Sequence, residues 1–162
     1  MGRPLLAQRR GKGSPAFKVA SKRFKLEASY RTYAKADVVS GEVIEIRDDP
    51  ARTGPLMRVL YEDKIQSYVP AAEGAFVGMT LEEGPAAIPT IGNVLPLKSI
   101  PESFPVFNVE TRVGDGGSLI RSSGSCGYVV SKIKGKVLIK LPSKKTRYFH
   151  EDCRATIGCN AG

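Results

Sequence analysis

Tryptophan is absent from this sequence, and histidine and cysteine are scarce, at one and three among 162 residues. The single histidine, His150, leaves little scope for a Ser–His–Asp or Cys–His catalytic centre. The cysteines are odd in number and form no C-x-x-C pair, so a reducing compartment fits better than a disulfide framework. A zinc site would need every available ligand, at spacings that common zinc sites do not use. We therefore expect no metal on this set, which is Cys126, His150, Cys153 and Cys159.

Long apolar runs are missing as well. No stretch of about eighteen apolar residues occurs, which argues against a transmembrane helix. The N-terminus is basic but lacks the apolar core of a secretory signal. Gly11, Gly13 and Pro15 argue against the amphipathic helix of an organellar transit peptide. We expect no membrane partner.

The phosphate-binding motifs of nucleotide enzymes are also missing. Residues 112–125, RVGDGGSLIRSSGS, are rich in glycine, but no GxxxxGK[ST] loop occurs there. The dinucleotide pattern GxGxxG fails too, because its last position, counted from Gly114, is Leu119. Nucleotide binding is therefore a weak interpretation of this stretch.

Paired carboxylates for acid–base catalysis are not indicated either. Asp48/Asp49 and Glu82/Glu83 are neighbours in sequence, so in a strand or turn their side chains would point apart. His150 lies three residues before Cys153, and two side chains this close along a strand rarely reach catalytic geometry. An exposed residue at the end of a strand is the simpler interpretation of His150. We expect no enzyme activity, no cofactor and no small-molecule substrate.

The net charge of +9 is unevenly distributed along the chain. Residues 1–35 carry ten basic residues and one acid, and residues 111–162 carry ten basic residues and three acids. Between them, residues 36–110 carry five basic residues and twelve acids. Solubility alone does not need such segregation, whereas docking on a polyanion does.

Short strands account for most of the chain after residue 38. Alternating apolar residues are bounded by Gly and Pro turn signals, and Pro89, Pro96, Pro101 and Pro105 exclude a long helix. This pattern predicts an all-β chain of small antiparallel barrels with a break near residues 90–96. The segments expected to hold strands are 38–49, 56–63, 65–71, 127–142, 146–150 and 152–162.

The first 25 residues mix Arg, Lys, Gly, Ser and Pro with single apolar residues, and show neither helix nor strand periodicity. Alone, such a segment cannot bury enough surface to offset its ordering entropy. A disordered basic tail is one interpretation. An arm that becomes ordered on a polyanion, with its cations on phosphates, is the other.

Residues 112–125 also allow two interpretations without an enzyme. The glycines permit positive φ and a close approach of backbone N–H groups to phosphate, and Arg112 and Arg121 add planar donors. A long hairpin loop explains the composition about equally well.

Several motifs, in order along nearly the whole chain, resemble the universal L-two family of large-subunit ribosomal proteins, in its archaeal or eukaryotic cytosolic form. The opening MGRPLLAQRRGKGSP is similar to that branch's start, and DDPARTGPLMRVLYED is similar to the family's Asp-Pro-x-Arg loop and following strand. The fragments AAEGAFVGM, IGNVLPL, PVFNVE, GDGG…RSSGS, VLIKLPS and CRATIG follow in the family's order. Each fragment alone is weak, but their order and spacing together are specific.

The resemblance implies an OB-fold barrel followed by an SH3-like barrel, with a basic N-terminal extension. The corresponding ranges are 1–36 for the extension, 37–92 for the OB fold and 93–162 for the SH3-like barrel. It also implies a structural role in the large subunit, holding ribosomal RNA near the peptidyl-transferase region and supporting subunit association. The implied partners are large-subunit rRNA and other ribosomal proteins, on the cytoplasmic ribosome.

Two arginines carry the family's strongest association with RNA. By motif they fall on Arg52, in DPARTGP, and Arg121, in LIRSSGS. Arg52 has an alternative role as ion-pair partner of Asp48 or Asp49. The full set expected to bind RNA is Arg52, Arg121, Arg112, Gly116, Gly117, Ser122, Arg3, Arg9, Arg10, Lys12, Lys18, Lys22, Arg23, Lys25, Arg31 and Arg154.

The chain departs from the family at its end. Members continue past RATIG into a long basic extension, whereas this sequence stops at CNAG, so a role of the extension's histidine does not transfer and His150 is not its equivalent. Lys144 stands where glycine is usual, which makes a different hairpin turn there an expectation. The alternative function is a free-standing OB/SH3-like module for single-stranded nucleic acid. Such platforms usually present stacking aromatics, and only twelve Phe and Tyr are present, several of them needed for cores.

Overall fold

A computed structural model describes residues 3, 5–18, 26–31 and 38–162. The described part of the chain is nearly all-β, as predicted, and no helix in it has the length and apolar character of a membrane span. Its strands are β1 (Val39–Arg47), β2 (Leu56–Tyr61), β3 (Gln66–Pro70), β4 (Thr80–Glu83), β5 (Val94–Pro96), β6 (Pro105–Phe107), β7 (Gly127–Ile133), β8 (Lys136–Lys140), β9 (Thr146–His150) and β10 (Arg154–Ile157).

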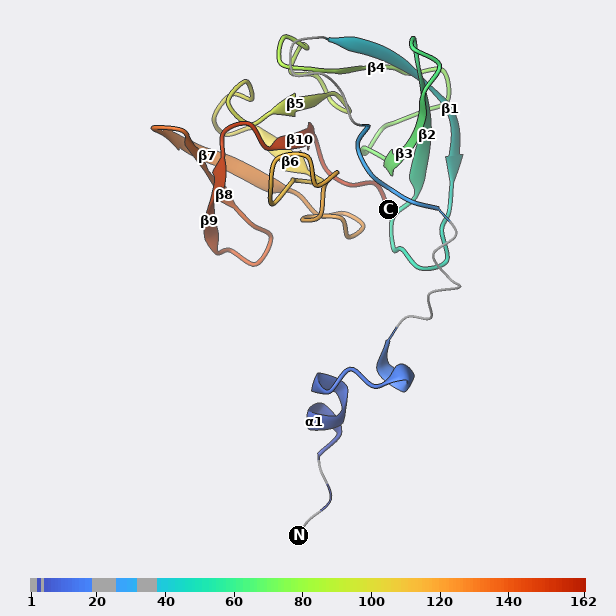
Figure 1. Ribbon diagram of the computed structural model, residues 1–162, viewed down its shortest axis with the longest axis vertical. Helices are drawn as coiled ribbons and strands as arrows, with labels where there is room; N and C mark the ends of the chain where they lie inside the picture. The colour runs from blue at the N-terminus through green and yellow to red at the C-terminus, as the bar shows by residue number, and fades with distance from the viewer. Residues whose placement is uncertain (1–2, 4, 19–25, 32–37) are drawn as a thin grey trace.

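The strands form two groups in space, which we call the N-terminal half (β1–β4) and the C-terminal half (β5–β10) (Figure 1). Their hydrogen bonding is continuous, in the order β3-β2-β1-β4-β5-β10-β6-β7-β8-β9. The halves join where Glu83 of β4 pairs in parallel with Val94 of β5. The last strand, β10, returns to lie between β5 and β6, beside this junction.

Each half has its own core of buried side chains. Buried residues alternate with less buried ones in β8, whereas β5 and β10 are buried along their whole length. In the N-terminal half the β2–β3 hairpin turns at residues 62–65. Buried side chains there include Val43, Met57, Val59, Tyr61, Val69 and Leu81. In the C-terminal half they include Leu95, Leu97, Ile100, Val106, Val109, Val129, Val137, Ile139, Phe149 and Ile157. Burying apolar side chains of this size stabilises the fold by about 1.5–3 kcal/mol each.

Residues 26–31 lie within the range expected for the basic arm, yet they belong to the folded core. Ala28 pairs in parallel with Tyr68 of β3, and Ala28 and Tyr30 are buried. The Tyr30 hydroxyl donates to the carbonyl of Asn108 at 2.7 Å and lies 2.6 Å from the Thr156 hydroxyl. This segment therefore bridges the two halves.

The described residues before this segment are exposed apart from Gly13, which is half-buried. They form a short helix, α1 (Leu6–Gly11), and a single 3-10 turn, η1 (Pro15–Phe17), where the sequence predicted no regular structure. The Gln8 side chain accepts the Leu5 N–H at 3.0 Å, which satisfies one of the free donors at the start of α1. The helix adds no buried side chain to the core.

Candidate RNA-binding site

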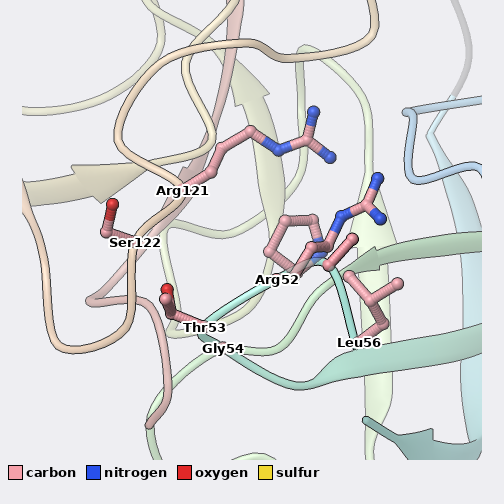
Figure 2. A pocket seen from close by; sticks show the side chains of 8 residues that line it. Arg52, Thr53, Gly54, Leu56, Arg121 and Ser122 are labelled. Carbon is pink, nitrogen blue, oxygen red and sulfur yellow. The ribbon is translucent and has the colours of Figure 1, made fainter. Parts of the chain in front are cut away.

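Arg52 and Arg121 come from different halves and meet at one opening. Arg52 lies in the loop between β1 and β2, and Arg121 lies in the loop before β7. Figure 2 shows both guanidinium groups extending to the same side of the opening. The residues that line it are Ala51, Arg52, Thr53, Gly54, Leu56, Pro70, Arg121 and Ser122.

The two loops are fixed to each other and to the C-terminal residues. The hydroxyl of Thr53 accepts the backbone N–H of Ser123 at 3.1 Å. The Asn160 side chain donates to the carbonyl of Arg121 at 2.7 Å. At Gly54, a Cβ would lie 2.8 Å from the carbonyl oxygen of Ala161, so only glycine fits there without a shift. The spacing between the two arginines is therefore set by packing.

Arg121 is half-buried and held by two carbonyls. It donates to Gly117 at 2.9 Å and to Ala28 at 2.7 Å, through different terminal nitrogens. Burial lowers the pKa of Arg121, and the positive charge of Arg52 lowers it further. The guanidinium still remains charged at neutral pH. Its orientation depends on residues 26–31, which supply one of the two acceptors.

Arg52 forms an ion pair with Asp49, which is the alternative role that the sequence suggested for it. One guanidinium nitrogen contacts the buried carboxylate of Asp49 and also donates to the Leu26 carbonyl at 3.2 Å. Its side chain keeps 20% of its surface exposed at the opening. Asp49 therefore orients Arg52 and offsets part of its charge, while the side chain stays accessible.

Gly116 and Gly117 are buried, and their N–H groups already have protein acceptors. Gly116 donates to Glu110 at 3.2 Å, and Gly117 donates to Asp115 at 3.0 Å. A Cβ on Gly116 would lie 2.8 Å from the Ser29 Cβ, and its φ is +77°. In this structure the two N–H groups are therefore engaged by protein acceptors, and Gly116 packs against residues 29–30, so this geometry does not support their contact with phosphate.

Arg154 is also misplaced by the sequence-based prediction. It is buried at the start of β10 and donates to Glu110 at 2.7–2.9 Å and to Glu83 at 2.8 Å. A further bond reaches the Arg31 carbonyl at 2.7 Å. Since the guanidinium is buried among these internal partners, this structure does not support contact between Arg154 and an external phosphate.

Arg31 has internal partners too. Its guanidinium pairs with Asp63 at 2.7 Å and lies 5.1 Å from the centre of the Tyr61 ring. The side chain is only 8% exposed. Direct RNA contact by Arg31 is therefore not supported by this geometry.

The remaining predicted residues are exposed or lie outside the described part of the chain. Arg112 and Ser122 are exposed on the same loop as Arg121. Exposed cations before residue 19 are Arg3, Arg9, Arg10, Lys12 and Lys18. Lys22, Arg23 and Lys25 lie outside the described residues. Within the residues described, no cluster of three or more His, Cys, Asp or Glu side chains is placed to hold a metal ion.

Sequence reasoning missed the partners that build the site. The Ala28 carbonyl, the Thr53 hydroxyl and the Asn160 amide leave no local signal, because each acts on a residue at least 39 positions away. The basic residues of β7–β9 do leave a signal, an uninterrupted run of one charge sign, but they were not included in the expected set.

Comparisons with known proteins match each half of the chain to a domain of the same family. The family model described as Ribosomal Proteins L2, RNA binding N-terminal domain, matches residues 5–83, and the model of the C-terminal domain matches residues 90–162. Large ribosomal subunit protein uL2 of Archaeoglobus fulgidus is 43% identical over 162 residues, which cover 100% of this chain and 68% of that protein. The uL2 proteins of Natronomonas pharaonis (42%) and Methanothermobacter thermautotrophicus (40%) match 100% of this chain and 67% and 68% of their own lengths. The nearly all-β structure fits the OB-fold and SH3-like domains expected for such relatives.

Proposed function

This chain belongs to the L2 family of large-subunit ribosomal proteins, and we propose that it is a structural component of the large ribosomal subunit that binds large-subunit rRNA. Its place is near the peptidyl-transferase region, where it supports subunit association on the cytoplasmic ribosome. Other ribosomal proteins are its further partners. Residues 1–36 act as the basic extension, 37–92 as the OB fold and 93–162 as the SH3-like barrel.

The pairing of Arg52 and Arg121 at one opening carries this proposal. The positive charge of Arg52 disfavours the charged form of Arg121, because like charges repel. A phosphate between them relieves that repulsion and accepts planar, charge-assisted hydrogen bonds from both. Since the two side chains come from different halves, an RNA strand bound there also clamps the halves together.

The other loop residues support these two arginines. Gly117 and Ala28 supply the carbonyls that orient Arg121, and Asp49 orients Arg52. Ser122 lines the opening and Arg112 is exposed nearby on the same loop, so both are proposed as additional contacts. The arm cations add phosphate contacts without reading sequence.

The test is the salt dependence of binding to a large-subunit rRNA transcript. If the arm and the opening together contact on the order of six to ten phosphates, affinity falls by roughly 10³–10⁵ between 50 and 200 mM salt. Co-sedimentation with large subunits from source cells is the accompanying measurement. A flat salt dependence, or a chain absent from large subunits, would overturn the proposal.

A further inference from the structure

The three strands β7, β8 and β9 carry an unusually pure positive charge. Residues 127–150, which contain these strands and their turns, hold seven Lys or Arg and no Asp or Glu. The strands pair antiparallel in sequence order and lie at the far edge of the sheet from β1–β4 (Figure 1). The cations are Lys132, Lys134, Lys136, Lys140, Lys144, Lys145 and Arg147.

Strand register sorts these residues onto two faces. The inner face is built from Val129, Val137, Ile139 and Phe149, which are all buried. On the outer face Tyr128 pairs with Lys140, which pairs with Thr146. The next rows there pair Leu138 with Tyr148 and Lys136 with His150.

The two tyrosines of this outer face are more exposed to solvent than the other tyrosines in the described residues. Tyr30 and Tyr61 are buried in the core, and Tyr68 is half-buried. Tyr128 is 47% exposed and Tyr148 is 54% exposed. They lie on the two outer strands with β8 between them, so the face presents two separate aromatic surfaces beside lysine side chains.

The acids nearest to this face in the described residues follow β9 directly. Glu151 donates its N–H to the Gly135 carbonyl in the β7–β8 turn, and Asp152 pairs with Lys98 at 2.9 Å and lies 3.8 Å from the His150 ring nitrogen. Lys132 donates to the Lys98 carbonyl.

On the outer face Lys140 lies opposite Tyr128 and Thr146, and Lys136 lies opposite Ile133 and His150, so positive charge gathers there without a directly opposed like-charge pair. Lys144 holds a φ of +65° in the β8–β9 turn, a conformation that side chains other than glycine rarely adopt. A surface with this much charge of one sign attracts a polyanion.

We propose that the outer face of β7–β9 is a second RNA-binding surface, separate from the Arg52/Arg121 opening, and that it takes unpaired nucleotides. Bases stack on Tyr128 and Tyr148, and Lys136 and Lys140 contact the phosphates between them. The turn lysines Lys144 and Lys145 extend the track along the backbone. This inference rests on the proposed RNA-binding function and adds a distinct site to it.

Unpaired RNA fits this surface better than a duplex or an acidic peptide. An aromatic ring stacks on a base only when that base is not already stacked within a helix. Sheet faces with exposed aromatics and flanking cations bind single strands in this way, with site sizes of about 4–16 nucleotides. An acidic peptide would use the lysines but would gain little from two separated tyrosine rings.

Tyrosine fluorescence gives a direct readout, because the chain has no tryptophan. We would titrate the full chain with an unstructured oligouridylate of about ten nucleotides, and with a blunt RNA duplex of equal phosphate count. Quenching by the single strand is expected. In Tyr128→Leu and Tyr148→Leu the affinity should fall about tenfold each, since base stacking on an aromatic is of that order. Phe76→Leu, an aromatic 61% exposed in the acidic region, is the matched control and should bind as the unmodified chain does.

The lysines are tested by the salt slope. For single strands the slope of log K against log salt is about 0.7 per phosphate neutralised, so Lys136→Gln with Lys140→Gln should reduce its magnitude by roughly 1.4. Lys64→Gln, an exposed lysine in the acidic region, should leave the slope unchanged. Thermal midpoints within a degree or two of the unmodified chain would show that each variant is folded.

The outcomes separate this site from the proposed function. Three results would overturn the second surface. The oligonucleotide could still quench fluorescence after both tyrosine substitutions, or Phe76→Leu could weaken binding as much as they do. Polyglutamate could also displace the oligonucleotide as effectively as RNA does. If the unmodified chain shows no salt-dependent binding to the rRNA transcript, the proposed function is instead overturned. The two experiments use different RNAs, so either can fail alone.

Discussion

The guanidinium of Arg154 is hydrogen bonded to the carboxylate of Glu110 inside the protein, where the two halves meet. Glu110 is fully buried, and its carboxylate accepts hydrogen bonds from both the guanidinium and the backbone N–H of Arg154. The same guanidinium reaches Glu83 at the end of β4, and its charge lies 5.1 Å from the centre of the Tyr30 ring. One side chain therefore ties together β4, β10, the 26–31 segment and the loop that carries Arg121.

Removing the guanidinium of Arg154 should destabilise the folded protein. We expect Arg154→Met to lower the free energy of unfolding by about 3–5 kcal/mol, because Glu83 and Glu110 are left buried without their shared partner. Burial already raises the pKa of Glu83 in spite of the opposing charge of Arg154, which shows how poorly this carboxylate is hydrated. Denaturant unfolding at neutral pH measures the loss.

The acids provide the control for this interpretation. The double variant Arg154→Met/Glu110→Gln should recover part of the stability lost in Arg154→Met, because one buried charge is removed with its partner. Strictly additive losses in the two variants would show that the ion pair is not the source of the effect.

Gly116 should tolerate alanine much less well than Gly114. Both have positive φ, +77° and +82°, so an added Cβ carries a similar conformational cost at each. At Gly116 the new Cβ would also lie 2.8 Å from the Ser29 Cβ, whereas at Gly114 nothing lies within 4 Å. We expect Gly116→Ala to lose about 1–2 kcal/mol more than Gly114→Ala in unfolding experiments. Equal losses would mean that the contact with Ser29 does not restrain the loop.

Arg121 should not be replaceable by lysine. Its terminal nitrogens donate to two carbonyls, of Gly117 and Ala28, and an ammonium cannot hold both while facing a phosphate. We expect Arg121→Lys to weaken binding to large-subunit rRNA by about 1–3 kcal/mol in a filter-binding titration. Arg47→Lys, at the exposed end of β1, is the matched control and should change little. If both variants bind alike, charge alone accounts for Arg121.

Strands β1–β3 and β7–β10 lie in segments that the sequence predicted, whereas β4, β5 and β6 do not. The segments of β7, β8 and β9 end at turn residues, and β7 and β8 alternate in hydrophobicity, which are local signals. The structure brings Arg52 and Arg121, the two motif positions, to one opening. Local charge says nothing about distant partners, however. Arg154 looks like one more cation of a basic region, while its partners Glu83 and Glu110 lie 71 and 44 residues away.

The glycine-rich loop shows the same limit. Its composition correctly indicates positive φ at Gly116 and Gly117, because a side chain is disfavoured there. Composition does not specify which surface the loop contacts. The structure shows that surface to be residues 29–30, in a segment whose basic neighbours made it resemble part of a disordered arm.

Asp115 should give this loop a pH dependence. Partial burial alone would raise its pKa, but hydrogen bonds from the Thr111 hydroxyl and from the N–H groups of Arg112, Gly117 and Thr111 together lower it below 3.8. A folded-state pKa below the unfolded-state value means that the carboxylate stabilises the loop above the ordinary pKa. That contribution is lost as the pH falls through the folded-state value.

Amide exchange at Gly117, whose N–H donates to Asp115, measures this loss directly. After correction for intrinsic exchange rates, we expect protection to persist at about pH 4, the ordinary range of an aspartate, and to decline only as the pH falls further. In Asp115→Asn the decline should disappear, because the side chain no longer titrates. Asp48→Asn, an exposed acid on the loop of Arg52, should keep the decline seen in the unmodified chain. A decline that persists in Asp115→Asn would show that Asp115 is not its source.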